Sequence, residues 1–138
     1  MRTPIHLWLV VCVATVWVFL RGLTFALRYT DGFQDIALRA PDVFGYFSTL
    51  PLWLQVIMAV EIIAGAVFVI LLIRRRAGAL RAAEGMFLTL LFAQIHQAVS
   101  LPARVLSVQG IVSFGIGLLL VAGFYMYARR QIRRGVLT

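Results

Sequence analysis

Four long runs of apolar residues, separated by shorter and more polar segments, organise the chain. Each run holds about 20 residues, which at a rise of about 1.5 Å per residue lets a helix cross the roughly 30 Å apolar layer of a membrane. Pro51 opens the second run, at a position where the first turn of a helix tolerates proline. The pattern predicts helices at residues 5–27, 51–73, 83–101 and 105–127.

The longest connector, residues 28–51, is too long to be a hairpin turn alone. Asp31 and Gly32 form a turn signal, and Pro41 begins a new segment in which Asp42 suits the first turn of a helix. Aromatic side chains in this segment favour the headgroup zone of a membrane. We therefore expect a short outer-surface helix between the first and second long helices, covering that end of the bundle.

Positive charge is distributed unevenly between the connectors. Cytoplasmic loops of membrane proteins carry an excess of Lys and Arg. If four helices cross, one side holds Arg2, Arg74, Arg75, Arg76, Arg81, Arg129, Arg130, Arg133 and Arg134. On the other side, Arg28, Arg39 and Arg104 are offset by Asp31, Asp35 and Asp42. We therefore predict a multi-pass protein of the bacterial inner (cytoplasmic) membrane with both termini in the cytoplasm.

The composition agrees with a lipid environment. Hydrophobic residues make up 62% of the 138 residues, whereas about half is usual in soluble domains, and so short a chain cannot bury that excess. We expect one transmembrane domain over residues 1–138, an all-α four-helix bundle. Its first helix is expected to be retained, because bulky residues and Arg21 do not suit a signal peptide. The net charge of +8 does not indicate nucleic acid, because the arginines lie at the ends of apolar runs.

Ionisable side chains inside the apolar runs are the candidate functional residues. Glu61 lies near the middle of the second run and Arg21 in the outer half of the first. A lone charge at mid-membrane costs from about 3 to more than 10 kcal/mol, so an ion pair between the two is expected. By helical rise, polar residues of the third run reach a similar depth. The predicted buried polar cluster is Arg21, Glu61, Gln94, His96 and Gln97, in which any of the last three takes the spare lone pairs of the carboxylate.

This cluster has three interpretations. It can tie helices together where lipid gives no hydrophobic driving force, contact another subunit, pigment, quinone or lipid headgroup, or mark a solute or proton pathway. The apolar inner half of the runs argues against a channel. His96 is a candidate ligand for haem or a chlorophyll-type pigment, but a lone membrane histidine is more often hydrogen-bonded, so no cofactor is predicted. No metal site is predicted either, because no second Cys or His stands at ligand spacing.

Small residues mark one face of the fourth run. Gly110, Ser113 and Gly117 let a neighbouring backbone approach closely, so they are predicted to be helix-packing residues. The chain shows no nucleophile–base pair, phosphate-binding glycine loop or paired carboxylates. We therefore expect a protein that is not an enzyme.

Three stretches carry a resemblance to a known group: "HLWLVVCVATVW" (6–17), "YFSTLPLW" (46–53) and "LLIRRRAG" (71–78). Together they resemble small bacterial four-helix inner-membrane proteins of unassigned role, often catalogued as putative sugar transporters. The likeness covers roughly the first 80 residues. It implies the same four-helix topology, and no functional residues are carried over.

Size, the small-residue face and the lack of a catalytic set favour an accessory or scaffold subunit that docks on a larger, energy-transducing membrane complex. The alternative is a small-solute transporter built around the polar cluster in the outer half of the bundle. Expected partners are membrane lipids and either other membrane subunits or further copies of the chain.

Overall fold

The computed structural model describes residues 5–30, 50–100 and 108–138, with some side chains near the start of the last range left out. Within these ranges the regular secondary structure consists of helices without a strand, as predicted. The helices are α1 (Ile5–Leu27), α4 (Leu52–Ile73), α5 (Ala79–Ser100) and α6 (Val108–Arg133). The short helix expected in the connector after α1 lies outside the described residues.

Two helices extend beyond the apolar runs that predict them. α5 begins at Ala79, four residues before the expected start at 83, and α6 continues to Arg133, past the expected end at 127. An apolar run records the part of a helix that suits hydrocarbon, whereas the backbone hydrogen bonds continue through polar residues. Arginines in the last turn also suit the negative end of the α6 dipole.

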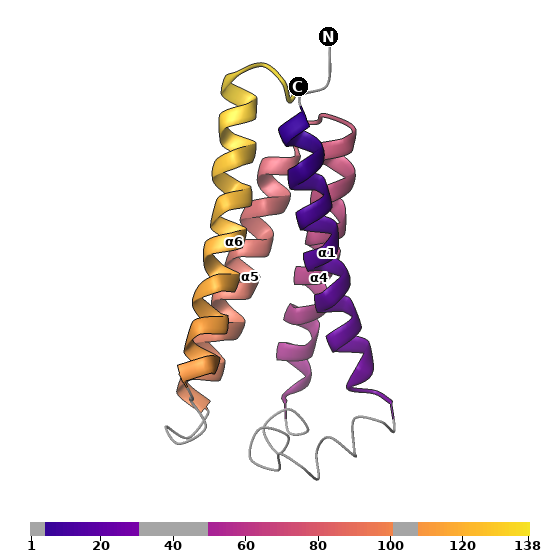
Figure 1. The fold of residues 1–138 in the computed structure, drawn as a ribbon. Coiled ribbons are helices and arrows are strands. Elements are labelled where there is room, and N and C mark those ends of the chain that lie inside the picture. Colours follow the sequence, from indigo (N-terminus) through magenta and orange to yellow (C-terminus); the bar gives the residue numbers. More distant parts are fainter. Residues whose placement is uncertain (1–4, 31–49, 101–107) are drawn as a thin grey trace.

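The helices pack in chain order, α1 on α4, α4 on α5 and α5 on α6 (Figure 1). The start of α1 and the end of α6 lie at the same end of the bundle, together with the hairpin between α4 and α5 (Figure 1). This arrangement gathers the arginines after α4 and those near the end of α6 at one end. We call it the arginine end; it holds Arg74, Arg75, Arg76, Arg130, Arg133 and Arg134.

The main core lies in the half of the bundle nearer the arginine end. Phe68 of α4 and Phe124 of α6 meet there with ring centroids 5.4 Å apart. Around them the four helices and the tail contribute buried residues: Leu7, Val11, Ala14, Leu72, Ala79, Ala83, Met86, Leu90, Val121, Ala128 and Leu137. A smaller core of Leu50, Leu54 and Met58 lies toward the other end. Apolar packing is therefore concentrated near the arginine end.

The tail after α6 folds back onto the hairpin between α4 and α5. Gly135 has a φ of 67°, the left-handed conformation that commonly ends a helix. The Thr138 N–H donates to the Arg75 carbonyl at 2.9 Å, and the Ala77 N–H donates to the Thr138 carbonyl at 3.0 Å. Arg75, with a φ of 54°, turns the chain at this point. Two backbone hydrogen bonds thus join the tail to the hairpin.

Much of the outer surface of the bundle is apolar. α1 and α4 are long and apolar enough to cross a membrane. In their most apolar 18-residue stretches, only 11% of α1 and 28% of α4 is buried. On α1 the exposed large apolar side chains follow helical spacing and form one continuous face, which we call the outer face of α1: Ile5, Trp8, Leu9, Val13, Val16, Phe19, Leu20, Leu23 and Leu27. The described parts of α5 and α6 are not apolar enough to count as membrane spans by the same measure of length and hydropathy.

Candidate functional site

Glu61 belongs to the buried face of α4. The buried residues of this helix recur at alternating spacings of four and three, so they form one stripe toward the other helices. The stripe consists of Leu54, Met58, Glu61, Gly65, Phe68 and Leu72. Apart from Glu61, this stripe is apolar. Burying a charge is costly unless the charge is paired, so the carboxylate of Glu61 needs a partner here.

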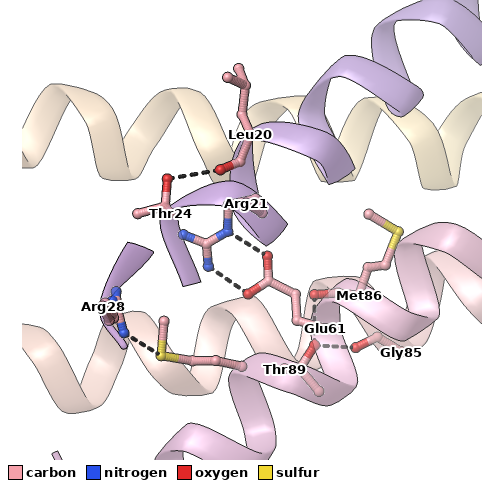
Figure 2. A network of polar contacts seen from close by, with 9 residues as sticks. Leu20, Arg21, Thr24, Arg28, Glu61, Gly85, Met86 and Thr89 are labelled. Atoms are coloured by element: carbon pink, nitrogen blue, oxygen red, sulfur yellow. Dashed lines mark hydrogen bonds and ion pairs between the residues drawn. The ribbon is translucent and has the colours of Figure 1, made fainter. Parts of the chain in front are cut away.

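Arg21 of α1 supplies that partner. Its Nε donates to Oε1 of Glu61 at 3.0 Å, and its Nη2 donates to Oε2 at 2.6 Å (Figure 2). The contact is bidentate, the geometry in which a guanidinium fits a carboxylate best. The side chain of Glu61 is 2% exposed and that of Arg21 is 28% exposed. The expected ion pair is therefore present, with both carboxylate oxygens engaged by one arginine.

A glycine brings α1 and α4 close enough for this contact. A Cβ added at Gly65, one turn along α4 from Glu61, would lie 2.6 Å from Cγ2 of Val18 and 3.3 Å from Cε of Met86. The first distance is too short for real atoms, so the position requires glycine unless a neighbour moves. α1 thus packs closely on α4 one helical turn from Glu61.

Trp17 adds a second contact to Arg21. The guanidinium carbon lies 5.8 Å from the centre of the indole ring, within cation–π range. The same ring reaches α6, where a Cβ added at Gly117 would lie 3.1 Å from Cη2 of Trp17. Within the described part of the chain, the buried Trp17 Nε1 has no hydrogen-bond partner. Trp17 thus spans the interior from the ion pair to α6.

The polar residues of α5 lie away from Glu61. Helix α5 packs on α4 with Gly85 beside Ala64 and His96 beside Trp53. This register places Gln94 roughly 9 Å and His96 roughly 12 Å along the axis from the level of Glu61. In the described part of the chain Glu61 accepts hydrogen bonds from Arg21, and none joins it to Gln94, His96 or Gln97. The predicted five-residue cluster is therefore split into an ion pair and a separate group on α5.

His96 belongs to an aromatic contact near the end of α5 that lies opposite the arginine end. Its ring packs edge-on against Trp53 with centroids 5.1 Å apart, and Ser100 Oγ lies 3.5 Å from both ring nitrogens. Gln94 instead points toward α6, where its Nε2 would lie 3.5 Å from a Cβ at Gly117. Among the described residues no three His, Cys, Asp or Glu side chains form a group that could hold a metal ion.

The predicted packing face of α6 is described in part. Gly117 is buried against Trp17 and Gln94, so a larger side chain there would meet both. The surroundings of Gly110 and of the Ser113 side chain lie outside the described part of the structure, so the packing role of these two residues stays a prediction.

The hydrogen bonds of the pair run directly between α1 and α4. Both oxygens of Glu61 accept a hydrogen bond from Arg21, so the carboxylate is held at two points by the neighbouring helix. Hydroxyls around it are also engaged locally: Thr24 donates to the Leu20 carbonyl and Thr89 to the Gly85 carbonyl, each at 2.8 Å (Figure 2). The arrangement suits holding α1 on α4.

Two further residues, Gly65 and Trp17, belong to this site. Gly65 with nearby Ala59 gives only a weak sign of close helix packing in the sequence, and the pattern does not show how near Val18 lies. The contacts of Trp17 with Arg21 and Gly117 could not be predicted, because the contact with Gly117 joins helices that are distant in the sequence.

No protein-family model, curated protein or solved structure matches the chain.

Proposed function

We propose that the chain is a non-enzymatic four-helix protein of the bacterial inner membrane, and that it serves as an accessory subunit docked on a larger, energy-transducing membrane complex. The observation that supports this most directly is the weak coverage of α1. Its inner residues Leu7, Val11 and Ala14 are buried, while its outer face is apolar and exposed. α1 is joined to the bundle chiefly through α4, so most of its surface is available to lipid or to another protein.

Membrane placement is supported by the low burial of the two most apolar helices. The core helix of a soluble protein is apolar because it is enclosed, but 11% and 28% burial leave α1 and α4 largely uncovered. Exposed apolar surface on this scale marks an interaction with membrane or protein. The arginine end is then the cytoplasmic end by the positive-inside rule.

The pairing of Arg21 with Glu61 supports the subunit rather than the small-solute transporter. A transport site needs polar groups that can engage a solute, whereas Arg21 and Glu61 engage one another through two hydrogen bonds and Glu61 is 2% exposed. Polar side chains in the interior of a membrane bundle also stabilise helix association. In this proposal the pair keeps α1 in a fixed position, so that its outer face can be recognised.

The proposal is tested by purification from native membranes in mild detergent. We expect a fixed stoichiometry with a larger membrane complex, and an absorption spectrum of the pure complex would reveal a bound pigment. Cys12 provides a site-specific probe, because it is exposed on α1. A thiol-directed photo-crosslinker at Cys12, activated in native membranes, should give one adduct of defined mass.

Two results would contradict the subunit proposal. One is an isolated chain that moves small solutes across liposomes, which would favour the transporter. The other is photo-crosslinking of Cys12 that yields lipid adducts and no protein adduct. The variant Cys12→Ala is the matched control, since it removes the thiol while leaving the apolar face of α1 intact.

A further inference from the structure

A surface groove lies between α5 and α6, away from the Arg21–Glu61 pair. It has a volume of about 410 Å³, within the roughly 300 to 1,000 Å³ usual for small-molecule sites. Its lining is mostly apolar and includes Phe87 and Leu88 from α5 and Ala122 and Met126 from α6, with Glu84 and Tyr125 as its polar residues. We call this the α5–α6 groove. Its apolar lining suits a hydrocarbon chain.

Two arginines flank the groove on the side of the arginine end. Arg81 precedes Glu84 by three positions on α5, and Arg129 follows Tyr125 by four positions on α6. Residues three or four apart share a helix face, so each arginine stands about one turn beyond the lining. α5 and α6 run in opposite directions, and the two turns therefore fall at the same end of the groove. Both side chains are exposed.

The polarity of the groove changes in steps along its length. Arg81 and Arg129 come first, and Glu84 and Tyr125 follow about one turn deeper, beside Met126. Phe87, Leu88 and Ala122 lie beyond them. An anionic phospholipid changes in the same order, from phosphate through the glycerol and ester region to the acyl chain. Arginine binds phosphate oxygens well because its guanidinium presents several donors in one plane.

We propose that the α5–α6 groove binds one acyl chain of an anionic phospholipid, whose phosphate is held by Arg81 and Arg129. Glu84 keeps the phosphate at the level of the arginines, because its negative charge repels a phosphate that moves deeper. The site rests on the membrane placement proposed above but does not require a partner complex. Basic pockets beside cytoplasmic helix ends are a known way to select anionic headgroups.

The test uses the full-length protein in mild detergent, titrated with phosphatidylglycerol and followed by native mass spectrometry. Phosphatidylcholine with the same acyl chains is the reference lipid. We expect Arg81→Gln with Arg129→Gln to weaken phosphatidylglycerol binding about 25-fold, since one arginine near an anionic surface accounts for about fivefold. The matched control is Arg74→Gln with Arg134→Gln, which removes the same charge from exposed arginines outside the groove and should change binding less than about twofold.

Two further variants separate the acyl chain from the charge. Ala122→Phe fills the groove and keeps both arginines, and it should weaken binding several-fold. Glu84→Gln removes the repulsion and should strengthen binding, about twofold to fivefold by the same charge argument. Weaker binding by Glu84→Gln would overturn the proposal, because the carboxylate would then be accepting hydrogen bonds from a different kind of ligand.

Other outcomes also overturn the site. They are equal binding of phosphatidylcholine, equal losses in the groove pair and the control pair, or a change of oligomeric state in Ala122→Phe, which would make the groove an interface between copies. Failure of the membrane placement is recognised separately. A chain that stays dispersed in buffer without detergent contradicts that placement, whereas a chain that needs detergent but shows no headgroup preference contradicts the lipid site alone.

Discussion

Two polar contacts between α1 and the other described helices differ in burial and in the side chains that they join. Beside the tight helix contact, Arg21 binds Glu61 of α4 through two hydrogen bonds, and the carboxylate is almost fully buried. Near the arginine end, His6 Nδ1 lies 2.8 Å from the hydroxyl of Tyr127 on α6, and this contact is exposed. One is an ion pair with a buried carboxylate, and the other is an exposed contact between a histidine and a tyrosine.

The comparison shows that the burial of a polar contact determines how much stability is lost when the contact is broken. An exposed group that loses its partner is hydrated by water, so the net loss is small. A buried charge that loses its partner keeps the full cost of desolvation, which is much larger than the net value of the intact pair. The Arg21–Glu61 pair is therefore a larger constraint on α1 than the His6–Tyr127 contact.

The largest effect is expected from breaking the buried pair on one side. Glu61→Gln leaves the guanidinium of Arg21 without its counter-charge and should lower the free energy of unfolding by about 3 to 5 kcal/mol. Unfolding of the detergent-solubilised protein by added sodium dodecyl sulfate, followed by circular dichroism, measures this loss.

The double variant Arg21→Met with Glu61→Leu removes both charges and should recover most of that loss, because similar apolar volume then fills the site. Glu84→Gln is the control for removing a carboxylate at an exposed position and should have little effect on unfolding. If the double variant is as unstable as Glu61→Gln, the pair stabilises the fold by more than the mutual neutralisation of its two charges.

A smaller loss is expected from Gly65→Ala. The added Cβ would lie 2.6 Å from Val18 Cγ2, so α1 and α4 must separate, at a cost of about 1 to 3 kcal/mol by analogy with overpacked cores. Gly123→Ala is the matched control, because no heavy atom lies within 4 Å of its added Cβ. Val18→Ala in the same chain should relieve the clash, and an unchanged loss in that double variant would contradict this explanation.

The smallest effect is expected from Tyr127→Phe. It removes the hydroxyl that contacts His6 and should lower the free energy of unfolding by at most about 1 kcal/mol, as for other solvated hydrogen bonds. The same detergent unfolding assay compares it with Glu61→Gln. Equal losses from the two variants would remove the distinction between the buried and the exposed contact.

The helices and the partner of Glu61 could be predicted from the sequence because each follows from a local cost. Apolar runs of sufficient length predict helices, and a carboxylate inside such a run must find a counter-charge, for which Arg21 stood at a compatible depth. These arguments need only distance along a helix. The bounds of α5 and α6 were less accessible, because hydropathy does not register the polar turns at Arg81 and Arg130.

The rest of the cluster could not be predicted because it depends on the relative positions of the helices. Depth alone predicted Gln94, His96 and Gln97 beside Glu61. The packing of α5 on α4 places Gly85 beside Ala64, and this register leaves the three polar residues farther along the axis. A shift of a few residues along a helix axis changes every facing pair, and an apolar pattern does not specify that shift. The nearness of Val18 to Gly65 has the same origin.

The fork of two hydrogen bonds between Arg21 and Glu61 also has a rotational consequence. A single hydrogen bond would constrain the rotation of α1 about its own axis only weakly. Two parallel hydrogen bonds to a planar carboxylate constrain that rotation more strongly. The side of α1 that carries Phe19 and Leu23 is thereby always directed away from α4. Exchanging Arg21 for lysine would preserve the charge but remove this angular constraint, so the orientation of α1 would then depend on its apolar packing through Leu7, Val11 and Ala14.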